Sequence, residues 1–156
     1  MIAEQTIEEV LAELEAGGDF EREVTALSEA QPYLLDYLTN EDVEAFTEQE
    51  RQLLLFATLV IHRSVVAAER TGRGQYHPNQ FTEAEERNYE LLQDGKGNFR
   101  ERLTPFFEQS EEEELLAFVE DLVTIEAEEE TISREAREPL FVTLKTVIDV
   151  LTAPAR

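Results

Sequence analysis

The stretch "LLLFATLVIHRSVVAA", residues 53–68, decides the fold that this sequence predicts. At about 100° per residue, its apolar side chains cover most of a helix circumference instead of a single stripe. A helix that is apolar nearly all round is buried on most sides. The preceding residues, Thr47-Glu48-Gln49-Glu50, have the form of a capping box. We therefore predict a central hydrophobic helix over about residues 48–71.

Helix signals continue on both sides of this segment, and strand signals are nearly absent. Apolar residues repeat at helical spacing from Ile7 to Leu14, and residues 140–151 carry one apolar face. Residues suited to helix starts recur along the chain: Thr6, Asp19, Pro32, Asn40 or Thr39, Thr47, Thr82 and Ser110. The sequence therefore predicts an all-α protein, a bundle or array of about six to eight helices in a single domain, residues 1–156.

Composition excludes several classes of protein. The chain has no cysteine, which excludes disulfides, thiolate catalysis and Cys-based metal sites. Its longest nearly apolar run, residues 53–61, is much shorter than the roughly 20 residues of a membrane-spanning helix. The first 15 residues, MIAEQTIEEVLAELE, alternate acidic and apolar side chains, which is not typical of a signal peptide. We expect a cytoplasmic protein with no membrane partner.

The net charge of −23 is the extreme property of the sequence, with 36 acidic and 13 basic residues. Residues 1–62 hold 15 acidic and two basic side chains, residues 103–156 hold 14 and four, and residues 63–102 hold seven of each. The acidic flanks repel phosphates, so we expect no nucleic acid binding. Two other interpretations of the acidic composition stay open: a halophilic adaptation to a salt-rich cytoplasm, or an acidic surface that mimics nucleic acid.

Motifs for catalysis, metals and cofactors are absent from the sequence. It contains no G-x-S-x-G, P-loop, G-x-G-x-x-G or H-E-x-x-H pattern. Neither His62 nor His77 has a glutamate three residues before it, as the ligand pair of di-iron bundles requires. We therefore predict no catalytic residue, no metal and no cofactor, and an enzyme is the less favoured interpretation.

Candidate binding residues gather at the end of the central helix and in the irregular segment after it, residues 72–81. His62 lies on one line of the helix with Thr58 and Glu69, at the edge of a polar pocket or of the core. Loops often carry function, and Arg and Tyr are favoured at binding hot spots. The candidates for a ligand or partner site are His62, Arg63, Glu69, Arg70, Arg73, Tyr76 and His77. Alternatively, the arginines of this region, together with Arg100 and Arg102, pair with the abundant glutamates.

The function that we expect is that of a protein-interaction or accessory module. Its partner is another protein or a second copy of the chain, as a homodimer. The basis is the lack of catalytic motifs and the contrast between the acidic ends and the arginine-bearing middle. The alternative is a helical bundle, catalytic or not, that binds a small molecule or an anion in a pocket near His62 and residues 70–78.

Overall fold

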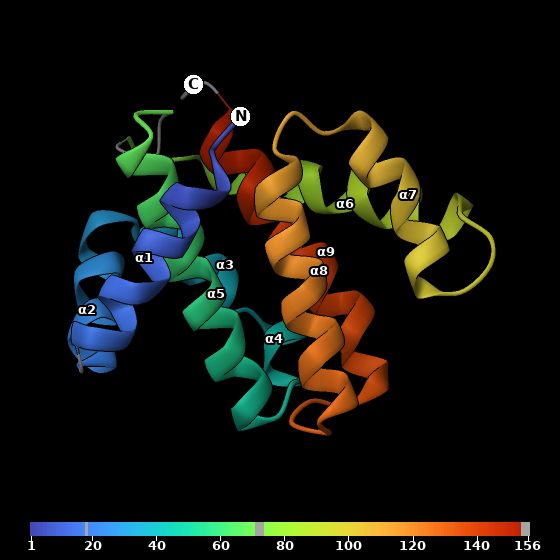
Figure 1. Ribbon diagram of the computed structural model, residues 1–156, viewed down its shortest axis with the longest axis horizontal. Coiled ribbons are helices and arrows are strands. Elements are labelled where there is room, and N and C mark those ends of the chain that lie inside the picture. Colours follow the sequence, from blue (N-terminus) through green and yellow to red (C-terminus); the bar gives the residue numbers. More distant parts are fainter. Residues whose placement is uncertain (18, 71–73, 154–156) are drawn as a thin grey trace.

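In the computed structural model, the apolar segment quoted above lies within α5 (Glu48–Ala67), a helix near the middle of the fold (Figure 1). The predicted capping box is present: Thr47 Oγ1 accepts from the Glu50 amide at 3.1 Å, and Glu50 Oε1 accepts from the Thr47 amide at 2.9 Å. The helix ends at Ala67, just before Glu69 takes a left-handed φ of 55°. The central hydrophobic helix is therefore confirmed, although it ends earlier than residue 71.

A second buried helix, α9 (Arg134–Thr152), shares the centre with α5. Every side chain from Leu140 to Ile148 is buried, including Thr143, Lys145 and Thr146. The sequence shows only one apolar face here, but α9 packs against α5, α6 and α8, which cover its other sides as well. Pro139 lies inside α9, whose N-cap is Ser133.

The structure describes residues 1–17, 19–70 and 74–153, and in these ranges it contains nine helices and no strand. The all-α class is thus confirmed, and the count exceeds the expected six to eight because the shortest segments are helical too. The remaining helices are α1 (Glu4–Gly17), α2 (Phe20–Ala30), α3 (Pro32–Leu38), α4 (Glu41–Glu44), α6 (Pro78–Asp94), α7 (Phe99–Gln109) and α8 (Glu113–Glu128).

The predicted N-caps at Asp19, Asn40 and Thr47 are confirmed, because each side chain accepts a hydrogen bond from a backbone amide of the first helical turn. Pro32 opens α3, as predicted.

The predicted helix starts at Thr6, Thr82 and Ser110 are wrong. Thr6 and Thr82 lie inside α1 and α6, and Ser110 precedes the true N-cap of α8, Glu112, by two residues. The irregular segment that we expected over residues 72–81 is shorter as well, because α6 begins at Pro78.

The helices pack on one another around one hydrophobic core. Helix α1 packs on α5, α2 on α3 and α5, α3 on α6, and α7 on α6. Three aromatic rings meet edge to face in the core: Phe141 lies between Phe106 and Phe99, with centroid distances of 5.2 and 6.0 Å. No helix among the described residues has the length and the apolar character needed to cross a membrane.

Candidate functional site

A pocket of about 440 Å³, the α1–α2–α5 pocket, lies between these three helices. Its interior is formed mainly by apolar side chains: Val10 of α1, Leu27 of α2, and Leu59 and Val66 of α5. Val10, Leu27 and Leu59 are buried members of the core. The pocket therefore opens directly onto the hydrophobic core beside α5.

The pocket exists because α1 and α2 are held apart. Both helices pack on α5, but they make few contacts with each other although only two residues separate them in the sequence. Three of the side chains that line the space between them are small: Ala26 and Ala30 of α2 and Ala67 of α5. Leu27 is the one described residue of α2 that is fully buried. As a result, neither helix fills the gap above α5.

Carboxylates surround the apolar interior. Glu9 and Glu13 of α1 are four residues apart, so they lie on one face of the helix, and Glu23 of α2 also lines the pocket. Glu9 and Glu13 are exposed, and Glu9 accepts a hydrogen bond from Gln5 Nε2 at 3.2 Å. The pocket thus combines an apolar interior with three acidic side chains.

Two of the candidate residues from the sequence, His62 and Arg63, line this pocket. Both are half-buried, and Arg63 forms an ion pair with Glu23, which connects α5 to α2. The polar pocket that the sequence suggests near His62 is therefore a mostly apolar pocket with charged groups around it.

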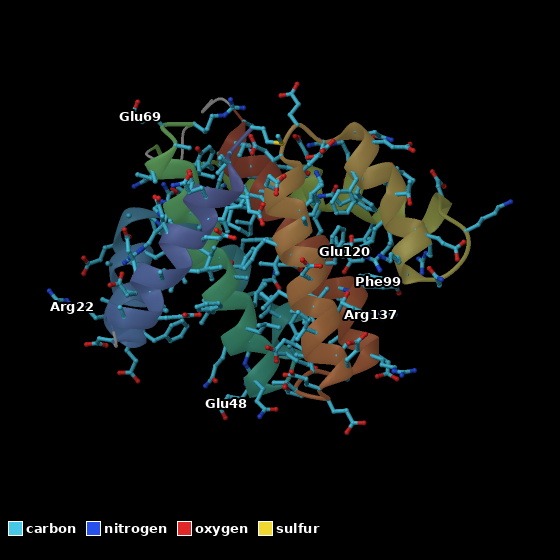
Figure 2. All side chains as sticks on the ribbon, viewed as in Figure 1. Arg22, Glu48, Glu69, Phe99, Glu120 and Arg137 are labelled. Atoms are coloured by element: carbon cyan, nitrogen blue, oxygen red, sulfur yellow. The ribbon has the colours of Figure 1, made fainter. Side chains whose placement is uncertain are left out.

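The other candidate residues lie elsewhere. Glu69 is exposed beyond the end of α5 (Figure 2), where its left-handed backbone terminates the helix. Arg70 pairs with the buried Glu112 at 3.3 Å and lines a separate polar cavity of about 190 Å³. Tyr76 is buried in the core, and its hydroxyl donates to the Leu151 carbonyl at 3.2 Å.

His77 caps α6, because its Nδ1 accepts from the Asn79 amide at 3.1 Å. Arg73 lies outside the described residues. The candidates that the structure describes therefore divide between the α1–α2–α5 pocket, the core and two helix ends, instead of meeting in one site.

Among the described residues, the arginines that the sequence groups together do not form an anion-binding cluster, because each described one pairs with a different glutamate. The pairs are Arg63–Glu23, Arg70–Glu112, Arg100–Glu120 and Arg102–Glu138. This matches the alternative interpretation of the arginines given above.

Sequence reasoning missed the residues of α1 and α2 that complete the pocket. One signal was available: Glu9 and Glu13 flank the apolar Val10 at a spacing of one helical turn. The alanines at 26, 30 and 67 give no such signal, because alanine occurs on buried and exposed helix faces alike.

Other cavities are lined by more polar groups. One of about 370 Å³ lies between α7, α8 and α9, near Phe99, Glu120 and Arg137 (Figure 2). The Arg137 guanidinium lies 4.3 Å from the Phe99 ring centroid. Burial raises the pKa of Glu120 above its ordinary value, although the nearby Arg100 opposes this rise.

Another cavity, of about 490 Å³, is lined by Glu50 and Ser133, which are occupied in capping α5 and α9. Among the described residues, no group of three or more His, Asp or Glu side chains is placed to hold a metal ion.

Comparison with protein-family models, with curated proteins and with solved structures gives no match for this chain.

Proposed function

We propose that the protein is an interaction module that binds another protein by taking apolar side chains of its partner into the α1–α2–α5 pocket. The observation that carries this proposal is a mostly apolar pocket between two helices that both pack on α5 but hardly on each other. Ligand sites are typically concave, mostly apolar and roughly 300–1,000 Å³ in volume, a range that includes this pocket.

The volume is consistent with a few side chains of a partner. A cavity of about 150 Å³ holds one benzene molecule, so about 440 Å³ accommodates roughly three groups of that size. Three apolar side chains are what an amphipathic helix presents at positions i, i+4 and i+7.

A photo-crosslinking experiment tests this proposal. A benzophenone amino acid replaces Ala67, which lines the pocket, and in a matched control it replaces Glu48, which is exposed at the start of α5 (Figure 2). In extracts of the source cells, we expect one discrete adduct from position 67 and none from position 48. The captured protein, once purified, should bind the wild-type chain directly and bind Ala26→Trp, whose indole takes up part of the pocket, more weakly.

Three outcomes would overturn the proposal: no adduct from position 67, the same adducts from both positions, or a captured protein that binds Ala26→Trp and wild type equally well. Circular dichroism of Ala26→Trp checks that the helices remain formed.

A small apolar molecule is the second candidate ligand, because the pocket volume also suits one. Native mass spectrometry of the protein purified from its source cells distinguishes the two. A bound small molecule adds a constant mass to wild type but not to Ala26→Trp, whereas a protein-binding pocket shows the mass of the chain alone.

A further inference from the structure

We infer that the occupant of the α1–α2–α5 pocket is a basic amphipathic helix, whose apolar side chains enter the pocket and whose Lys or Arg side chains contact Glu9, Glu13 and Glu23. This inference rests on the proposed function and adds the chemistry of the partner. It follows from the position of the three carboxylates around a mostly apolar interior.

The carboxylates of α1 are spaced to contact a second helix. Glu9 and Glu13 lie about 6 Å apart along the helix axis, at a rise of about 1.5 Å per residue. Basic side chains one turn apart on a neighbouring helix have the same spacing. Both glutamates are exposed, so a cation can reach them without disturbing the core.

Glu23 lines the same pocket from α2, and it pairs with Arg63 of α5. The side chains of this pair are 32% and 34% exposed. Arg63 Nη2 pairs with Glu23 Oε2, and a carboxylate accepts through two oxygens, so a basic side chain of the partner can share Glu23 with Arg63. The pair therefore does not block a basic occupant.

The wider charge of the chain favours the same occupant. Residues 1–62, which include α1, α2 and most of α5, hold 15 acidic and two basic side chains. Such a surface attracts a basic segment during approach and repels an acidic one. A second copy of the chain also carries −23, so its approach is opposed by repulsion.

The test uses three synthetic helical peptides of about 18 residues, long enough for appreciable helix formation. Their apolar positions are identical and include one Trp, and their flanking positions are all Lys, all Gln or all Glu. Because the protein has no Trp, the Trp emission reports the peptide alone. The titrations are made at low ionic strength. We expect the affinities to follow the order Lys, Gln, Glu, with binding of the Lys peptide weakened by salt.

A pair of charge-matched triple variants locates the interaction. Glu9→Gln/Glu13→Gln/Glu23→Gln removes the pocket carboxylates. Glu8→Gln/Glu15→Gln/Glu29→Gln removes three exposed carboxylates from the same two helices, outside the pocket lining. The loss of three charge contacts corresponds to roughly tenfold weaker binding of the Lys peptide to the first variant. The second variant, with the same net charge, should bind it nearly as well as wild type.

The inference is overturned if the Gln or Glu peptide binds as tightly as the Lys peptide, or if both variants lose affinity equally. In either case a discrete adduct from position 67 still supports a protein-binding pocket, so the proposed function survives. If no peptide binds, the inference of a basic helix as occupant is again wrong, and the crosslinking result alone decides the proposed function.

Discussion

At the scale of single residues, one buried carboxylate joins two helix starts. Glu50 is 3% exposed; its Oε1 accepts from the Thr47 amide at 2.9 Å and its Oε2 from the Ser133 amide at 2.8 Å. Burial raises the pKa of Glu50, but the bonds from Ser133 and Thr47 outweigh it, so the pKa lies below its ordinary value of 4.5. The charged form of Glu50 therefore stabilises the fold.

We expect Glu50→Gln to lower the free energy of unfolding by about 1–3 kcal/mol at pH 7, because an amide cannot accept both bonds through oxygen. Because the folded pKa is lowered, the contribution of Glu50 is fully present above pH 4.5 and declines as the pH falls through the folded pKa. Urea unfolding at pH 7 and at acidic pH measures this. A difference between wild type and variant that does not shrink in acid would contradict the assignment.

In a second residue pair, Tyr37 and Glu85, the pKa of the glutamate is raised instead of lowered. Burial raises the pKa of Glu85, and the hydrogen bond that Tyr37 donates at 2.8 Å partly offsets this rise. We expect Tyr37→Phe to raise the pKa of Glu85 further, while the ring keeps its stacking on Phe81 at a centroid distance of 5.0 Å. NMR titration of the Glu85 carboxyl carbon measures the change.

The control for Tyr37→Phe is Tyr33→Phe, on the same helix, because Tyr33 is 41% exposed. It should leave the Glu85 titration unchanged. An equal change in both variants, or none in Tyr37→Phe, would show that the hydroxyl does not set this pKa.

At the scale of helices, α5 and α8 end in the same way although neither has a glycine at the end. After α8, Glu130 has a φ of 61°, its amide donates to the Ala127 carbonyl and the Thr131 amide donates to the Glu126 carbonyl. Glu69 occupies the equivalent position after α5. This is the Schellman arrangement, in which the left-handed residue is usually glycine because a Cβ is strained there.

We therefore expect Glu130→Gly to raise the free energy of unfolding by about 0.5–1 kcal/mol. The control, Glu129→Gly, removes the same charge at a right-handed φ of −81° and should instead destabilise. Thermal unfolding of both variants measures the difference. Equal shifts would mean that charge, not backbone conformation, determines the effect.

These helix ends also show which parts of the fold can be predicted from the sequence and which cannot. Periodicity predicted the helical class and the buried α5, because burial repeats along a helix in a pattern that the sequence preserves. It could not predict that Glu69 or Glu130 ends a helix, since glutamate favours helix interiors. The candidates named from the sequence include His62 and Arg63, which line the pocket, but not Glu9, Glu13 and Glu23, because the pocket depends on how α1 and α2 pack on α5.

At the scale of the whole molecule, the net charge of −23 means that carboxylates repel one another over long distances. Among the described residues five ion pairs are present, against 36 acidic residues in the chain, so most carboxylates have no cation close by. Salt screens such repulsion, with a Debye length of about 10 Å at 0.1 M and about 3 Å at 1 M. The native state should therefore be more stable at high ionic strength.

We expect Tm to rise with KCl, most steeply below about 0.5 M, where the Debye length changes most. Screening alone predicts a plateau above that concentration. A further rise of Tm over the molar range would favour a halophilic adaptation, one of the two interpretations that the acidic composition allows. The comparison is Glu111→Gln/Glu128→Gln/Glu129→Gln, three exposed positions at which the net charge falls from −23 to −20. Its Tm should exceed that of wild type at low salt and approach it at high salt, since a screened charge no longer repels. A Tm that does not respond to KCl in either protein would show that carboxylate repulsion does not limit the stability of this fold.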